Sequence, residues 1–428
     1  MPRPFTRRTL LKSSAALGAG MMVGPSLRPF GTAASDRLDV AVVGVASRGR
    51  ANLDGVAAEN VVALCDVDRV QLDAAAERFP RARTFQDWRK MLDAVKADAV
   101  VVSTPDHHHA PVTLAAMQLG WHAYTEKPLA HTVEEARRMA ELAAEKGLVT
   151  QMGTQIHAGG NYRRVVEAIR SGVLGRVPEV HVFCNAHWGG GGRPTGQHAT
   201  PGHLDWDVWL GPAPSRPYAP GYHPAQWRRY WDFGGGSLAD MACHFVDLPF
   251  WALGLRHPIS VEAEGEDEHH GSCPRWSSVR WEFPQRGARG PVLLTWHDGG
   301  RYPDARREWG CEDWDSGVLF VGEKGALIAD YSRFQLLPAE EFSGWQAPPR
   351  SIPDSVGHHR EWIEACKGRG KTTCHFDHAG ALTETVLLGT VAYRCRTRLS
   401  WDPDSLTATG HADAHGLVKK VYRSGWQI

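Results

Sequence analysis

The chain has 428 residues, of which 42% are hydrophobic and 22% are charged, and this ordinary globular composition excludes an intrinsically disordered protein. Lys and Arg number 48 and Asp and Glu also number 48. The chain therefore lacks the excess of basic residues that is typical of nucleic-acid-binding proteins. The length predicts two to three domains. The 17 Trp and 22 His favour a polar, stackable ligand such as a sugar, although most could equally be core Trp and surface His.

Residues 1–35 read as a targeting segment. Arg7-Arg8 precedes a short apolar run, Ser13–Val23, that is rich in Ala and Gly, and small residues such as Ala34 offer a cleavage site. The segment resembles a twin-arginine export signal, and the alternative is a disordered basic N-terminus. The run is shorter than the roughly 20 residues that span a bilayer. We therefore expect a periplasmic or otherwise exported protein with no membrane anchor after cleavage.

A nucleotide-binding turn follows the first predicted strand, Leu38–Val43. The turn has the pattern G-x-A-x-x-G, a variant of the dinucleotide fingerprint in which Ala replaces the glycine that approaches the pyrophosphate. A second strand begins at Val61 and ends at Asp66, about 20 residues after the first glycine. That is the spacing of the carboxylate that binds the adenosine 2′-hydroxyl, although a surface Asp at a strand end is the alternative. The candidate cofactor-binding residues here are Gly44, Ala46, Ser47, Arg48, Gly49 and Asp66.

Strand and helix patterns then alternate up to residue 153, which predicts a doubly wound parallel sheet, a Rossmann domain over residues 36–155. The further strands are expected at residues 99–103, 121–125 and 149–153, and the helices at residues 51–57, 70–79, 87–95, 110–119 and 133–146. Ligands bind outside the carboxyl ends of the strands in such sheets.

Two of these strand ends carry reactive residues. The loops Thr104-Pro105-Asp106-His107 and Glu126-Lys127-Pro128 are both expected to face the cofactor. A lysine beside a nicotinamide can donate hydrogen bonds to a substrate oxygen and lower the pKa of a neighbouring acid. The run from His107 to His109 is either a solvated loop or a cap of the following helix. Adjacent histidines alternate in direction, so we predict no metal site there.

With these motifs the chain resembles the Gfo/Idh/MocA oxidoreductase family, from Leu38 to the C-terminus. The resemblance rests on the glycine turn, the Thr104-Pro105-Asp106-His107 loop and, most specifically, Glu126-Lys127-Pro128. It implies an NAD-dependent enzyme that acts on sugars, inositols or related polyols. It further implies an α+β domain over residues 156–428 with an open, mostly antiparallel sheet, which provides substrate contacts and often the contacts of a homo-oligomer.

The second half begins with a helix at residues 161–171 and a strand at residues 178–184. Residues 187–231 are rich in Gly, Pro, His and Trp, and they form either a lid with aromatic faces or an oligomer interface. Later strands are expected at residues 278–283, 292–297, 317–321 and 326–329, and helices at residues 358–367 and 379–393, whereas residues 406–428 are hard to place.

A glycine run leads into a helix whose expected cap is Ser237. Asp240 and His244 lie one turn apart on this helix, where a carboxylate can raise the basicity of the imidazole or orient the substrate. Asp247, three residues further on, could act similarly. The pair matches the family's catalytic Asp and His, and the resemblance therefore implies that Lys127, Asp240 and His244 are the catalytic residues. Weaker candidates for substrate contacts are His157, Tyr162 and Trp231.

The leading interpretation is an NAD-dependent oxidoreductase that transfers hydride from a carbon bearing a secondary hydroxyl of a small-molecule sugar, glycoside or polyol. One alternative is a redox-neutral, NAD-dependent glycoside hydrolase or lyase that oxidises, eliminates, hydrates and reduces its substrate. Another is a non-enzymatic sugar sensor, against which the complete Lys, Asp and His set argues. None of the eight cysteines forms a C-x-x-C pair, so most are expected to be buried, although an exported protein could contain one disulfide.

Overall fold

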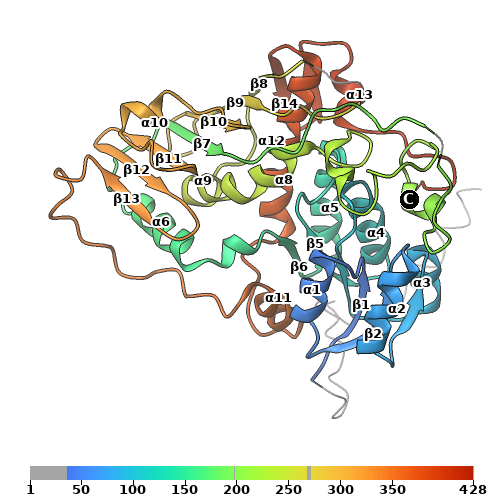
Figure 1. Cartoon of the computed structure of the whole chain (residues 1–428). Coiled ribbons are helices and arrows are strands. Elements are labelled where there is room, and N and C mark those ends of the chain that lie inside the picture. The colour runs from blue at the N-terminus through green and yellow to red at the C-terminus, as the bar shows by residue number, and fades with distance from the viewer. Residues whose placement is uncertain (1–35, 197, 268–270, 428) are drawn as a thin grey trace, which may run out of the picture. The chain divides into compact units, whose positions relative to one another are not determined.

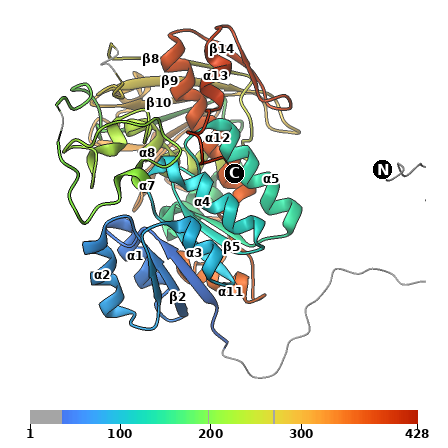
Figure 2. The same cartoon turned by 90° about the vertical axis from the view of Figure 1, so that its right-hand side faces the viewer.

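Two β-sheets organise the chain in the computed structural model, which describes residues 36–196, 198–267 and 271–427. The predicted export signal lies outside the described residues. From Arg37 onward the chain forms one compact unit. Within it, helix α8 (Gly236–Phe245) lies between the two sheets in both views (Figures 1 and 2).

The first sheet is parallel, as predicted, with the strand order β3-β2-β1-β4-β5-β6. Its central strands are apolar and buried, because helices cover both faces of a parallel sheet. The strands are β1 (Asp39–Val43), β2 (Asn60–Cys65), β3 (Arg83–Phe85), β4 (Ala99–Val102), β5 (His122–Glu126) and β6 (Thr150–Gly153). The short, partly exposed β3 was not predicted.

The helices of this half are α1 (Arg48–Gly55), α2 (Arg69–Arg78), α3 (Trp88–Ala94), α4 (Asp106–Gln118) and α5 (Val133–Lys146). Local sequence explains the limits of α5: Thr132 and Glu135 form a capping box, and Gly147 adopts the left-handed conformation that ends the helix. Helix α4 begins at Asp106, so the three-histidine run is its buried first turn. The solvated-loop interpretation of that run is therefore wrong.

The second sheet is mostly antiparallel, as predicted, with the order β13-β12-β11-β7-β10-β9-β8-β14-β15. Among the described strand pairs of this second sheet, only β7–β10 is parallel. The strands are β7 (Glu179–Cys184), β8 (Ser260–Gly265), β9 (Ser277–Phe283), β10 (Val292–Asp298), β11 (Ser316–Gly322), β12 (Gly325–Ala329), β13 (Phe334–Leu337), β14 (Leu399–Asp402) and β15 (Thr407–Thr409).

The remaining helices are α6 (Gly160–Arg170), α7 (Trp206–Leu210), α9 (Asp247–Leu253), α10 (Ala305–Glu308), α11 (His358–Cys366), α12 (Phe376–Cys395), α13 (Ala414–Val418) and the 3₁₀ turns η1 (Gln155–Ala158) and η2 (Gln226–Arg229). Helix α12 joins the two halves, because it packs on α5 and on β8. An ion pair between Arg137 and Glu384 at 2.8 Å fixes this contact. No helix among the described residues is long and apolar enough to cross a membrane.

Two sequence-based details need correction or qualification. Ser237 does not cap α8: the helix begins at Gly236, and the Ser237 hydroxyl accepts a hydrogen bond from the Trp188 N–H at 2.7 Å. All eight cysteines are unpaired thiols, and all but the half-buried Cys366 are buried, as predicted for most of them.

Candidate active site

A cavity of about 1290 Å³ lies at the carboxyl ends of the parallel strands, where the sheet topology predicts a ligand. Residues from the second half of the chain form its other walls. The structure brings together here most of the predicted site: Gly44, Ala46, Ser47, Arg48, Asp66, Thr104, Pro105, Asp106, Glu126, Lys127, Asp240 and His244.

The glycine turn adopts the conformation that its sequence predicts. Gly44 has a φ of 83°, and a Cβ there would lie 2.6 Å from the carbonyl oxygen of Ser103. Gly49 does not line the cavity; a Cβ at Gly49 would lie 2.1 Å from the Gly44 carbonyl oxygen, so its role is close packing of α1 against the strand. The turn therefore fits a dinucleotide, with Gly44 shaping it and Gly49 supporting it.

Asp66 follows β2 and lines the cavity, as the fingerprint predicts. Its two carboxylate oxygens accept hydrogen bonds from the Val45 and Asp68 N–H groups, each at 3.0 Å. Burial raises the pKa of Asp66, and these two bonds offset the rise only in part. The carboxylate is thus held in place at the end of the cavity formed by β2.

Asp66 is expected to make the protein prefer NADH over NADPH. A carboxylate and a 2′-phosphate are like charges, and two unit charges 4 Å apart near a protein surface repel by roughly 4 kcal/mol. We therefore expect NADH to bind at least about tenfold more tightly than NADPH, and Asp66→Ala to remove most of this preference. Fluorescence titration measures both affinities, and tighter NADPH binding by the unaltered protein would contradict the assignment.

The Glu126 side chain lines the cavity and is held in place by side chains that the sequence analysis did not single out. Its Oε1 accepts hydrogen bonds from the Asn52 and Gln155 amides, each at 2.8 Å. Asn52 also donates to the Ser103 hydroxyl at 2.9 Å. A Cβ at Gly153 would lie 2.5 Å from the Glu126 carboxyl group. These contacts fix the strand end that carries Lys127.

Lys127 and Asp240 form the central ion pair of the site. The Lys127 ammonium group donates to an Asp240 carboxylate oxygen and, at 3.0 Å, to the Asp240 carbonyl oxygen. Burial alone would raise the pKa of Asp240, but the charges of Lys127 and Arg228 outweigh it and hold this pKa below its ordinary value. Sequence reasoning missed Arg228, which lies in η2 and also lines the cavity.

His244 lines the same cavity, but its environment differs from the one expected. Burial, and after it the Lys127 charge, lowers the pKa of His244 to about 3, although the Asp240 and Asp247 charges raise it. The predicted effect of the carboxylates on the ring is therefore present, but burial outweighs it, and the Asp240 carboxylate makes its ion pair with Lys127. Nδ1 of His244 is buried and has no hydrogen-bond partner among the described residues. The ring is neutral at neutral pH and can accept a proton.

His107, predicted as a cofactor contact, does not line the cavity. Its ring nitrogens lie 3.0 Å from the Trp209 carbonyl oxygen and 3.4 Å from that of Phe233, because the helix start turns the ring into the second half of the chain. His109 instead bridges the two active-site loops, with ring nitrogens 2.8 Å from the Thr104 and 2.7 Å from the Pro128 carbonyl oxygens.

The three weaker candidates for substrate contacts lie outside the cavity lining. Tyr162 is buried and donates its hydroxyl to the His244 carbonyl oxygen at 3.1 Å. Trp231 lines a separate cavity of about 370 Å³. His157 is fully buried and its ring stacks on Trp251. Tyr162 on α6 and His157 on η1 are thus buried in the packing between elements, and Trp231 lies at a different cavity.

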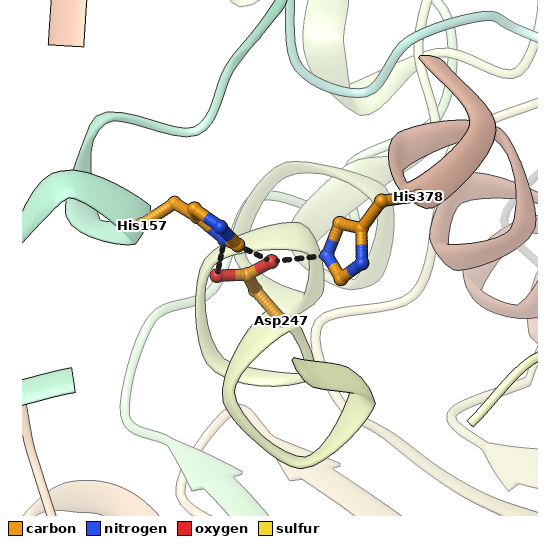
Figure 3. A group of neighbouring side chains, drawn as sticks. All are labelled: His157, Asp247 and His378. Carbon is orange, nitrogen blue, oxygen red and sulfur yellow. Dashed lines mark hydrogen bonds and ion pairs between the residues drawn. The ribbon is translucent and has the colours of Figure 1, made fainter. Parts of the chain in front are cut away.

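His157 belongs to a buried triad with Asp247 and His378 (Figure 3). Nδ1 of His157 lies 2.7 and 2.9 Å from the two Asp247 oxygens, and Nε2 of His378 lies 2.8 Å from one of them. The residue types suit a metal ion, but the nitrogens facing Asp247 are already hydrogen-bonded to it. The triad ties η1, α9 and α12 together. Asp247 therefore does not orient His244, as the sequence had suggested it could.

Residues 201–230, here called the strap, cover one end of the cavity. The Arg69 N–H donates to the His203 carbonyl oxygen at 2.9 Å, and the Asp205 N–H donates to the Val67 carbonyl oxygen at 3.0 Å. A His223 ring nitrogen lies 3.2 Å from the Asp68 carboxylate. The strap residues that line the cavity are Trp209, His223, Pro224, Ala225, Trp227 and Arg228. This placement agrees with the lid interpretation of the Trp-rich segment.

Comparison with known proteins identifies both halves of the chain. Residues 38–154 match the oxidoreductase family model for an NAD-binding Rossmann fold, and residues 161–293 match the model for the C-terminal alpha/beta domain of the same family.

Individual relatives match over part of their length. The D-glucoside 3-dehydrogenase of Escherichia coli K12 is 30% identical over 52% of this chain and 56% of its own. A glycosyl hydrolase family 109 protein of Shewanella pealeana is 28% identical over 40% of this chain and 41% of its own. The chain spans about half the length of these curated relatives.

A solved structure extends the similarity of fold to nearly the whole chain. The WlbA dehydrogenase of Bordetella pertussis, solved with NADH and UDP-GlcNAcA, superposes with a TM-score of 0.61 at 21% identity over 86% of this chain and 99% of that one.

Proposed function

Because the chain belongs to the Gfo/Idh/MocA oxidoreductase family and has that family's NAD-binding Rossmann domain, we propose that it is an NAD-dependent dehydrogenase of a sugar, glycoside or polyol. The observation that carries the proposal is the meeting of Lys127, Asp240 and His244 in one cavity with the glycine turn and Asp66. The name of the glucoside 3-dehydrogenase relative supports a secondary hydroxyl of a carbohydrate as the reacting group. Homo-oligomerisation stays a prediction from the family resemblance.

Bound NAD supplies a hydride acceptor, and the residues of the chain handle the hydroxyl proton and its developing charge. Lys127 can donate a hydrogen bond to the substrate oxygen and stabilise negative charge on it. Asp240 holds the Lys127 ammonium group through two hydrogen bonds and so positions this donor. His244 lies in the cavity as a neutral ring that can accept the hydroxyl proton, and a pKa of about 3 makes it a weak base in this structure. The glycine turn, Asp66 and the strap are placed to hold the dinucleotide.

The proposal is tested by incubating purified protein and NAD⁺ with a panel of sugars, glycosides and inositols. Formation of NADH together with a ketone at a former secondary carbinol, identified by NMR, is the expected result. Lack of NADH and of any ketone across the panel would reject the dehydrogenase assignment.

A redox-neutral glycoside hydrolase or lyase is the second candidate, and the family 109 relative favours it. In that reaction the oxidised carbon makes a neighbouring C–H acidic, so that a base in the cavity can remove the proton and the anomeric group can leave. Release of an aryl leaving group without net NADH formation would distinguish this candidate from a simple dehydrogenase.

We also propose export through the twin-arginine route, on the basis of Arg7-Arg8 and the short apolar run after it. Produced in a bacterium with this pathway, the protein is expected in the periplasmic fraction, shortened by about 30–35 residues. Changing both arginines to lysine is expected to abolish export, as measured by fractionation and N-terminal sequencing. Unaltered export of that variant would refute the signal assignment.

A further inference from the structure

Four charged side chains form a compact cluster on the wall of the cavity. Nη1 of Arg228 lies 3.1 Å from Oδ1 of Asp240 and 3.3 Å from Oδ1 of Asp106, and Lys127 binds Asp240 from the other side. Four elements supply them: Lys127 follows β5, Asp106 begins α4, Arg228 lies in η2 and Asp240 lies in α8. Two cations thus face two carboxylates, and the cluster has no net charge when both acids are ionised.

Two members of the cluster have hydrogen-bonding capacity that the described residues do not use. Asp106 is 1% exposed, and its Oδ2 is buried without any hydrogen-bond partner in the described part of the chain. Burying a carboxylate oxygen without a partner is unfavourable, and because Asp106 lines the cavity, a ligand bound there is the group that can supply the missing hydrogen bond. Arg228 uses only its Nη1 to contact Asp106 and Asp240. A guanidinium has five N–H donors, so the contacts with these two carboxylates leave other donors for a ligand.

The position of the Arg228 guanidinium is fixed by stacking. Its Cζ lies 4.3 Å from the centroid of the Trp227 ring, and both residues line the cavity. A planar cation stacked on an aromatic face loses little further freedom when it binds a ligand, because its orientation is already set. Arg228 therefore presents a rigid donor next to the orphan acceptor of Asp106.

Building on the proposed function, we propose that Arg228 and Asp106 form a substrate subsite that binds the hydroxyl adjacent to the oxidised one and selects uncharged sugars. A hydroxyl group is both donor and acceptor, so it can donate to Oδ2 of Asp106 while accepting from Arg228. Lys127 binds the neighbouring, reacting oxygen. A substrate carboxylate would instead have to displace Asp106 or Asp240 from Arg228 and leave a buried charge unpaired, which is strongly unfavourable.

The protonation state of Asp106 adds a pH signature. Burial raises the pKa of Asp106 to about 7. The charges of Arg228 and Lys127 lower this pKa, and the charge of Asp240 raises it. The ionised form, present above this pKa, accepts from the hydroxyl and pairs with Arg228. Below it the protonated form loses the ion pair, so the affinity for the substrate is expected to fall as the pH drops through about 7.

The test combines enzyme variants with monodeoxy analogues of the best substrate found in the panel. Removing the adjacent hydroxyl is expected to lower kcat/KM of the unaltered enzyme by about 10²-fold or more, since polar groups built to bind it stay unpaired. Arg228→Met is expected to lower kcat/KM for the parent sugar similarly, and then to lose less than about threefold more with the deoxy analogue. This non-additivity identifies two groups that contact each other.

Matched controls separate this role from a structural one. Arg229→Met changes the next residue of η2, which does not line the cavity, and should retain the full deoxy penalty. If Arg228→Met does not fold, Arg228→Lys replaces it in the test. This variant keeps the positive charge but loses the planar guanidinium, so its loss of kcat/KM with the deoxy analogue should be intermediate. Calorimetric Kd values for the sugar in the presence of NADH give a readout that does not depend on turnover, and Asp106→Asn should abolish their change near pH 7.

A full deoxy penalty in the Arg228→Met or Arg228→Lys enzyme would overturn the subsite while leaving the dehydrogenase assignment intact. Equal kcat/KM values for a neutral glycoside and the corresponding uronic acid would do the same for the selection of uncharged sugars. Absence of activity and of binding for every sugar, deoxy or not, would overturn both the subsite and the proposed function.

Discussion

Lys127→Met and His244→Ala enzymes are each expected to lose about 10²-fold or more in kcat. Lys127 carries the positive charge that stabilises the developing alkoxide, and removal of one preorganised donor typically costs 10²–10³ in kcat. In the proposed function His244 is the ring that takes the proton, and a positioned base contributes about 10²–10⁴ in rate. Steady-state and single-turnover kinetics with NAD⁺ and the identified sugar measure both losses.

The two variants should differ in what else changes. NAD affinity should change little in His244→Ala, because His244 lies on α8, outside the Rossmann half. In Lys127→Met the Asp240 carboxylate keeps only Arg228 as a cation, so its pKa should rise. Lys324→Met, which removes an exposed lysine from the turn between β11 and β12, is the matched control and should leave kcat unchanged.

An active His244→Ala enzyme would show that another group serves as the base. His157 and Tyr162, two of the candidates for substrate contacts, cannot replace it in this structure, because both are buried outside the cavity lining and bonded elsewhere. Water or Lys127 would then have to take that role. The double variant Lys127→Met/His244→Ala would distinguish them, because the residual activity should disappear in it only if Lys127 is the base.

The sequence predicted those parts of the site that local spacing determines. The distance from Gly44 to Asp66 follows from one strand–helix–strand unit, and the distance from Asp240 to His244 is one helical turn. Each places a side chain on a known edge or face without reference to the rest of the chain. For this reason both pairs of residues lie in the cavity as predicted, although the roughly 390 residues from Arg37 onward fold as one unit.

Partnerships between distant residues were not accessible in this way. Asp240 pairs with Lys127, 113 residues away, and not with His244, four residues away on the same helix. Arg228 had no recognisable motif, because its importance comes from meeting Asp106 and Asp240 across the cavity. His157 was a candidate for a substrate contact by residue type alone, but it is buried against Trp251 and Asp247 and does not line the cavity. Such outcomes depend on tertiary packing, which a single sequence does not specify locally.

The strap gives a physical basis for expecting a retained cofactor. It is bonded to the residues just after β2, beside the carboxylate that is placed to hold the adenosine ribose. Asp68 is 5% exposed and faces ring nitrogens of His223 at 3.2 Å and of His203 at 3.7 Å. A dinucleotide beneath the strap could dissociate only after these contacts open, so dissociation should be slow.

Protein purified from its native compartment is therefore expected to contain near-stoichiometric NAD(H) that survives dialysis. Asp68→Asn should weaken the strap, since an amide can still cap α2 but is a weaker hydrogen-bond acceptor for His223 than a carboxylate. Weakening a contact that covers the bound dinucleotide acts mainly on dissociation, so we expect NADH to leave at least about tenfold faster. Asp73→Asn, an exposed change on the same helix, should have no effect.

If the proposed export and the expected retention of NAD(H) both hold, they constrain the chemistry. Soluble NAD is not expected outside the cytoplasm, and an enzyme that kept its reduced cofactor would stop after one turnover. Either a partner redox protein reoxidises the cofactor, or the overall reaction is redox-neutral, as in the glycosidase alternative. Purified holoenzyme should then release the leaving group of an aryl glycoside, at least slowly, without added NAD, and deuterium at the carbon that loses the proton should exchange with water. Empty protein that requires continuous added NAD would refute retention and favour a dehydrogenase with an exchanging cofactor.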